Sequence, residues 1–262
     1  MRALRTHHRF YRTFANMATI ASPRVNRNLD NRFFAGMALA IAAAVLLGFA
    51  RTYFLAGMFH AKLPSPLVHV HAAVFLSWII FLAVQIWLVS SGRVGWHRQL
   101  GMFGAALAFA VVVLGLLTAT QSFARGFSPP GSRIPPATFY AIPMLQVLTF
   151  CVLFAAGFIK RVDGAAHKRF MLIATLAILG PAISRWPFPI VHKIPPLISV
   201  IVVLFLLSLV VFDLWTRRRI HRATATGGLF LVISQFSMFP IGQTHLWHRF
   251  ADWTLKLWTG AG

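Results

Sequence analysis

Two histidines, each followed by basic residues, stand at the mouths of two long apolar runs in this sequence. His97 lies in GRVGWHRQLG, residues 92 to 101, and His167 lies in RVDGAAHKRFM, residues 161 to 171. Neutral imidazole is an axial ligand suited to haem iron. Gly101 follows His97 by four residues, so it shares a helical face with it and would leave room for a flat macrocycle. These three residues are therefore candidates for a site that binds haem b.

The same residues have a plainer interpretation. Basic residues gather in the cytoplasmic loops of membrane proteins, and imidazoles there can hydrogen-bond loop carbonyls or lipid phosphates. Polar residues at the membrane interface are ordinary, whereas those inside the bilayer are the stronger signal of function. Both interpretations of the two histidines stay open on the sequence alone.

The composition is that of a membrane protein. Hydrophobic residues make up 58% of the 262 residues and charged residues 11%, and the mean hydropathy is +0.73, far from the composition of soluble domains. Twenty-five basic residues against four acids give a formal charge of +21. Because the basic residues lie in short loops between apolar runs, they favour anionic lipid headgroups over nucleic acid as partners.

Seven apolar runs are long enough to cross a bilayer, which takes about 20 residues in a helix. Backbone groups in lipid must be satisfied within the segment, and runs of this length with helical character exclude a barrel. The predicted fold is therefore all-α, a polytopic bundle of seven transmembrane helices. The runs fall at about 34–58, 67–90, 101–124, 137–160, 169–185, 197–216 and 224–241.

Three regions follow from these runs. Residues 1–32 form a basic tail with no sustained apolar face, expected to be disordered and cytoplasmic, and Met1 or Met17 could be the true start. Residues 33–242 form the seven-helix domain. Its first apolar run is too long for a signal-peptide core, so we interpret it as a retained anchor. Residues 243–262 are a short interfacial segment.

The positive charges predict the orientation. If the N-terminus is cytoplasmic, that side collects seventeen Lys and Arg residues and the other side seven, with Arg51 in the outer part of the first helix. Cytoplasmic loops carry the excess of Lys and Arg. The sequence therefore predicts a multi-pass protein of the cytoplasmic (inner) membrane with its N-terminus inside and its C-terminus outside.

A second layer of histidines falls on the predicted outer side. His69 and His71 open a helix two residues apart, so they project about 200° from each other and do not chelate a metal by themselves. His245 and His248 are three residues apart and share a face. Together with His192 they are candidate ligands for copper or zinc, which imidazole suits.

The segments HRQLG and HKRFM carry a resemblance to known proteins. They resemble motifs of a group of uncharacterised bacterial multi-pass membrane proteins, in which H-R-x-L-G opens one span and H-x-R-[WF]-M opens a later one. Residues 67–185 are also distantly similar to the core of the transmembrane two-haem b-type cytochromes of the ferric reductase type. In those cytochromes, histidines on four consecutive helices bind one haem near each membrane face.

The cytochrome resemblance implies particular ligands. It places His97 opposite His167 as one haem pair, and it makes His69 or His71 half of the other pair. The run 137–160 contains no histidine, which departs from the cytochrome pattern. Met144 is the nearest substitute there.

These observations favour one function and leave two others. The leading hypothesis is a b-type cytochrome-like membrane oxidoreductase that exchanges electrons with quinone or another membrane redox carrier. A proton-coupled or small-molecule transporter is the first alternative, with Asp213 as the one acid within a span, and a non-catalytic accessory subunit is the second. A retinal protein is excluded, because no lysine lies in the middle of a span.

Overall fold

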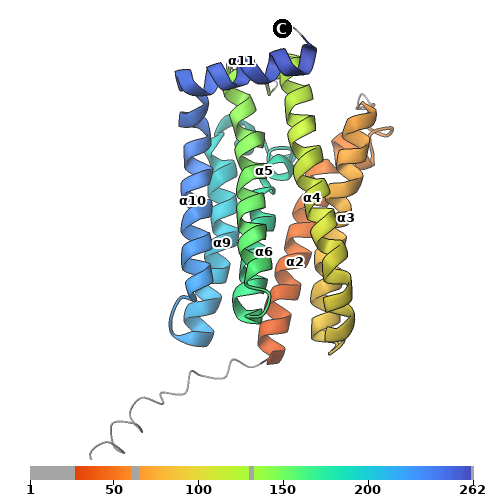
Figure 1. The fold of residues 1–262 in the computed structure, drawn as a ribbon, viewed down its shortest axis with the longest axis vertical. Coiled ribbons are helices and arrows are strands. Elements are labelled where there is room, and N and C mark those ends of the chain that lie inside the picture. Colours follow the sequence, from red (N-terminus) through yellow and green to blue (C-terminus); the bar gives the residue numbers. More distant parts are fainter. Residues whose placement is uncertain (1–26, 61–64, 130–132, 261–262) are drawn as a thin grey trace, which may run out of the picture.

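The computed structural model describes residues 27–60, 65–129 and 133–260, and every regular element in this part of the chain is a helix. The long helices lie side by side along the length of the molecule (Figure 1). In chain order the elements are α2 (Arg27–Phe49), a π-helix η1 (Ala50–Phe54), α3 (Pro66–Ser90), α4 (Val94–Ala124), α5 (Pro136–Ile159), α6 (Gly164–Ala177), α7 (Gly180–Ile183), α8 (Pro189–Lys193), α9 (Pro196–Arg217), α10 (Arg222–Gly242) and α11 (His245–Thr259).

Six of these helices are long and apolar enough to cross a membrane. They are α2 with η1, α3, α4, α5, α9 and α10. The all-α prediction is confirmed for the described residues, and the six helices indicate a multi-pass membrane protein. Most of the expected tail lies outside the described residues, but Arg27–Arg32, which we assigned to it, form the start of α2. Asp30 is tied there to Lys168 of α6 by an ion pair, which gives these residues a partner that hydropathy does not reveal.

The run predicted at 169–185 is a broken helix. α6 has 14 residues and ends at Ala177, and the short α7 begins at Gly180 with Pro181 in its first turn. Proline has no backbone N–H and disfavours the helical conformation of the residue before it, so the chain breaks here. The expected seventh uninterrupted span is therefore absent from this segment.

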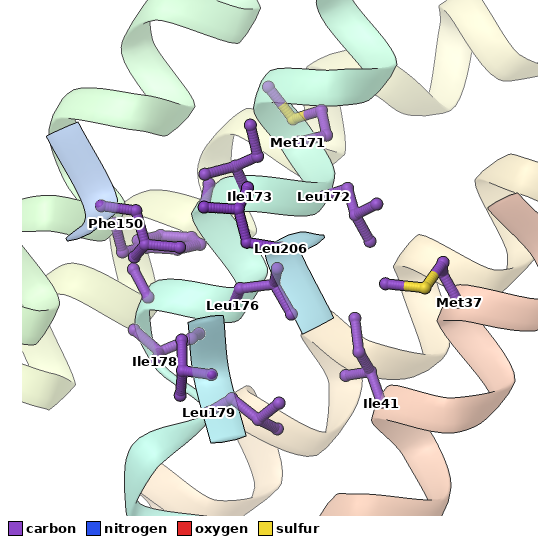
Figure 2. Close-up of a cluster of buried hydrophobic side chains, with 14 of the residues drawn as sticks. Met37, Ile41, Phe150, Met171, Leu172, Ile173, Leu176, Ile178, Leu179 and Leu206 are labelled. Atoms are coloured by element: carbon purple, nitrogen blue, oxygen red, sulfur yellow. The ribbon is translucent and has the colours of Figure 1, made fainter. Parts of the chain in front are cut away.

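The broken helix lies at the centre of the bundle. All ten residues from Met171 to Gly180 are buried, and Figure 2 shows α6 side chains packed between neighbouring helices. Ile41 of α2, Phe150 of α5 and Leu206 of α9 belong to the same buried cluster. This packing fixes the position of α6, and so of the histidine in its first turn.

The helices alternate in direction, so their ends form two layers. α2, α4, α6 and α10 begin at one end of the bundle, which we call the inner end after the predicted sidedness (Figure 1). α3, α5 and α9 begin at the opposite end, which we call the outer end. His97 and His167 therefore fall in the inner layer, and His69 and His71 in the outer layer.

Gly48 lets α2 approach the backbone of α7. A Cβ atom at this position would overlap the Ala182 carbonyl, and Gly48 itself is buried. We expect Gly48→Ala to destabilise the protein by about 1–3 kcal/mol, the usual cost of overpacking. Thermal unfolding in detergent measures this effect, with Gly36→Ala as the control because a Cβ there meets nothing within 4 Å. Equal melting temperatures for the two variants would contradict the prediction.

Candidate functional site

The structure brings His97 and His167 together at the inner end. His97 lies in the first turn of α4 and His167 in the first turn of α6, and their ring centroids are 6.1 Å apart with an interplanar angle of 81°. The start of α6 is fixed by Asp163, whose side chain accepts hydrogen bonds from the backbone N–H groups of Ala165 and Ala166 at 3.0 and 3.1 Å. Such capping satisfies donors that a helix start leaves free.

One nitrogen of His167 is held by the neighbouring helix. Its Nδ1 lies 2.9 Å from the carbonyl oxygen of Gly157 on α5. Since a carbonyl can only accept, Nδ1 is the donor here, and in the neutral ring this leaves a free lone pair on Nε2. Gly157 is needed for this approach, because a Cβ atom there would run into Met171 and Phe170. Metal-binding histidines are held in this way, with the second ring N–H donated to a carbonyl.

Gln85 of α3 lies close to the pair and has no partner for either side-chain atom. Its amide nitrogen and oxygen are buried without a hydrogen bond, as is Nδ1 of His97, and Gln85 is only 8% exposed. His97 contacts the backbone of Gln85. Buried polar atoms are nearly always hydrogen-bonded in folded proteins, so three unpaired atoms around one histidine pair mark a place where a ligand could bind.

A hydrogen bond deeper in the bundle aligns α3 with α6. Trp78 Nε1 donates to Thr175 Oγ1 at 3.2 Å, and the two helices run in opposite directions. Gln85 lies about two turns beyond Trp78 towards the inner end of α3. His167 lies about two turns from Thr175 towards the inner end of α6. Gln85, His97 and His167 therefore lie at one depth, and we call these three residues the inner site.

The glycines near His97 differ in what they face. A Cβ atom on Gly101 would meet nothing within 4 Å, so the surface beside it is open. Gly104, one turn later, is buried against the ring of Phe81. There is therefore space for a planar group next to α4 beside Gly101, whereas the ring of Phe81 occupies the space beside Gly104.

The outer histidines are separated from each other. His69 Nδ1 lies 3.0 Å from the hydroxyl of Tyr53, whereas His71 packs its ring 4.2 Å from that of Phe75. Nδ1 of His71 is buried without a partner. His71, Trp78 and Gln85 are spaced by seven residues and so share a face of α3. His71 is thus about 21 Å from the depth of Gln85, at 1.5 Å per residue.

Met144, the substitute ligand that the cytochrome resemblance suggested, packs elsewhere. It is buried in a second cluster with Tyr140 and Trp247. Its surroundings in that cluster are those of an ordinary apolar side chain.

Two of the three histidines expected to bind copper or zinc are paired with backbone carbonyls. His192 Nε2 lies 3.0 Å from the Trp186 carbonyl, and His248 Nε2 lies 3.0 Å from the Gly242 carbonyl. His245 is exposed. Among the described residues, no group of three or more His, Cys, Asp or Glu side chains is placed to hold a metal ion.

The inner end also contains a buried ion pair that sequence reasoning missed. Arg169 of α6 and Asp213 of α9 are both fully buried and bonded to each other, with Arg169 Nε 3.2 Å from Asp213 Oδ1. Asp213 Oδ2 also accepts from the hydroxyl of Thr224 at 2.5 Å and from the backbone N–H of His221 at 3.1 Å. Since its oxygens accept from several donors, Asp213 is suited to joining α6, α9 and α10.

The position of Arg169 is supported from two further sides. Its Nη1 donates to the Ala165 carbonyl at 2.8 Å, and the Phe34 ring of α2 lies 5.9 Å from its guanidinium carbon. Lys168 is 4.7 Å from the centre of the same ring. The one signal in the sequence was a lone aspartate inside an apolar run, which we considered only as a proton carrier.

His221 caps the start of α10 at the inner end. Its Nδ1 accepts a hydrogen bond from the Ala223 N–H at 3.1 Å at the start of α10. Partial burial, helped by the nearby charges of Arg169 and Arg217, lowers the pKa of His221 below its ordinary value, against the smaller opposing effect of Asp213 and Asp163. A lowered pKa in the folded state gives stability that is present above the unfolded value of about 6.5 and lost as the pH falls.

We therefore expect the melting temperature to fall on acidification below about pH 6.5, because protonated His221 can no longer accept at the helix start. His221→Asn should flatten this part of the profile, since asparagine caps helices without titrating. Melting curves of both proteins across the acidic range measure the effect. Parallel profiles for the two proteins would contradict the assignment.

Comparison with known proteins adds no relative. No family model, no curated protein and no solved structure matches this chain. What the fold and composition define is a class, a multi-pass helical membrane protein with six long apolar helices around a broken central one.

Proposed function

We propose that this protein is a b-type cytochrome-like membrane protein whose inner site binds haem between His97 and His167. The observation that supports this proposal best is the approach of the two imidazoles from separate helices. A bond of about 2.0–2.1 Å from imidazole nitrogen to a metal, on both sides of one ion, separates the two ring centroids by about 6 Å. The observed 6.1 Å fits this requirement.

The unpaired atoms of the inner site fit the same group. The carbonyl of Gly157 fixes the tautomer of His167 and leaves Nε2 for a metal. For the second imidazole, Nδ1 of His97 and the amide oxygen of Gln85 are both buried and unpaired. A rotation of the Gln85 side chain would let its amide oxygen accept a hydrogen bond from this nitrogen. Gln85 would then orient His97 as Gly157 orients His167.

A bound haem b would supply one-electron chemistry at this depth. The residues around it would hold the two imidazoles in place and enclose them with the apolar side chains of α3, α5 and α6. Gly101 would leave space beside the imidazoles for the flat group. The carrier that gives or takes the electron would be quinone or another membrane redox carrier. The proposal includes the predicted topology, with α6 and α7 as a seventh, broken crossing, an N-terminus in the cytoplasm, and insertion in the inner membrane.

The absorption spectrum of the purified protein tests the proposal. The protein should be produced with δ-aminolevulinate in the medium, so that haem supply is not limiting, and then oxidised and reduced in detergent. We expect a reduced-minus-oxidised difference spectrum of the b type with close to one haem per chain. A folded, monodisperse and colourless protein under these conditions would contradict haem binding and favour the transporter or the accessory subunit.

Gln85→Met separates the role of Gln85 from the general need for a folded bundle. Removing a buried, unpaired amide in favour of an apolar side chain of similar shape should leave the haem-free protein as stable or stabilise it by about 1 kcal/mol. Haem affinity should fall about 10- to 100-fold, the usual effect of losing a residue that orients a metal ligand. Haem titration and thermal unfolding of the same preparation measure both. Unchanged affinity would exclude Gln85 from the site.

A further inference from the structure

The last helix, α11, lies crosswise over the outer ends of α10, α5 and α4 (Figure 1). Two hydrogen bonds and one buried side chain show how it is held there. Trp247 Nε1 donates to the Ala137 carbonyl at 2.8 Å, His248 pairs with the Gly242 carbonyl, and Ala251 is fully buried. The helix begins where the Thr244 hydroxyl accepts from the Trp247 N–H at 3.2 Å. α11 is therefore a docked element with a defined face against the bundle.

The side chains of α11 sort into three stripes. The stripe against the bundle includes Trp247 and Ala251. At 100° per residue, a second stripe is centred about 100° from it. This second stripe, which we call the apolar stripe, consists of Leu246, Phe250, Trp253 and Leu257, with Leu246 78% exposed and Leu257 65% exposed.

The third stripe is polar and lies about 160° from the bundle, on the side facing away from it. It consists of His245, Arg249, Asp252 and Lys256, all exposed. α11 therefore has its charges above the bundle and its apolar stripe to one side, at the height where the long helices end.

We propose that the apolar stripe of α11 is inserted sideways into the lipid leaflet at the outer end, with the polar stripe in water among the headgroups. Helices with one charged and one apolar face lie in the plane of the membrane interface in this way. The residues of the stripe are apolar over its whole length, and Trp253 is of the type enriched at this depth. Arg249 and Lys256 are on the adjoining stripe, where their side chains can reach lipid phosphates.

Lipid, rather than a second copy of the chain, is the occupant that the surroundings favour. α10 leads directly into α11, and its last turns also expose Phe236 and Phe239. These residues are exposed apolar side chains of a candidate membrane-crossing helix, so hydrocarbon would border the bundle directly below the start of α11. The proposal does not depend on haem binding at the inner site.

Spin labels on the two exposed stripes test this placement in purified protein reconstituted into phosphatidylcholine vesicles. The single cysteine, Cys151, is first replaced by alanine. Labels are then attached in Trp253→Cys and Leu257→Cys for the apolar stripe, and in Asp252→Cys and Lys256→Cys as matched controls on the polar stripe. All four positions are exposed, so the substitutions should leave the bundle folded.

The ratio of collisions with oxygen to collisions with a water-soluble nickel chelate reports the surroundings of each label. We expect a several-fold higher ratio at positions 253 and 257 than at 252 and 256. Equal, water-like ratios at all four positions would overturn the proposal. Spin–spin broadening at 253 that disappears on dilution with unlabelled protein would overturn it as well, in favour of contact between two copies.

Discussion

If the inner site binds haem as proposed, alanine at His97 or His167 should abolish the spectrum of a haem with two imidazole ligands. Each substitution removes one of the two rings that lie 6.1 Å apart, so at most one axial ligand from the protein remains. We expect the single variants to lose the sharp reduced band of the wild-type protein, and the double variant to retain no haem after size-exclusion chromatography. Spectra of the oxidised and reduced proteins, with haem content per chain, measure this.

A matched control distinguishes the two proposed ligands from histidines in general. His245 is exposed and lies at the opposite end of the bundle, so His245→Ala should keep the wild-type spectrum. His97→Gly offers a second check, because imidazole added to the buffer could enter the space left by the side chain and restore the band. If His97→Ala and His167→Ala both keep the wild-type spectrum and haem content, the inner site is not the haem site.

Hydropathy predicted several long helices closely. The expected runs 67–90 and 137–160 correspond to α3, Pro66–Ser90, and α5, Pro136–Ile159. Length and apolar character depend on local composition, which a single sequence shows directly. The run 169–185 was predicted as one span and is instead divided between α6 and α7, because an average over the window hides how strongly one proline affects its neighbours.

The sequence predicted only part of the inner site. Topology placed His97 and His167 at one depth, but their lateral separation depends on how α4 and α6 pack. Gln85 was not among the candidate site residues. α3 is apolar on all sides, so nothing in its pattern shows which side faces the bundle. Trp78 and Thr175 supply that information in the structure, through a hydrogen bond between residues 97 positions apart.

The pairing of Arg169 with Asp213 shows the same limit. The two residues are 44 positions apart, and only the packing of α6 against α9 joins them. We interpreted Arg169 as a cytoplasmic surface charge because it follows His167 and Lys168 in a basic cluster. Instead Lys168 is partly buried on Asp30 and Arg169 is fully buried. A positive charge near a helix end can thus mark a buried network as well as the side of the membrane.

Asp213→Asn is expected to have the largest effect on stability. Asparagine keeps the shape of the side chain but leaves the fully buried guanidinium of Arg169 without its countercharge. Removing one partner of a buried ion pair costs about 3–5 kcal/mol. The variant should therefore melt well below the wild-type protein in detergent, whereas Asp252→Asn, at an exposed aspartate on α11, should not.

The double variant Arg169→Met with Asp213→Leu shows whether the loss comes from the unpaired charge. Replacing both members of a buried pair by apolar side chains is often neutral or stabilising, so the double variant should recover much of the stability lost in Asp213→Asn. Under the proposed function it should also still bind haem, because the hydrogen bonds of the pair join it to α6, α9 and α10 and not to the two imidazoles. A double variant as unstable as the single one would show that the hydrogen bonds of Asp213 to Thr224 and to the start of α10 matter more than the charge.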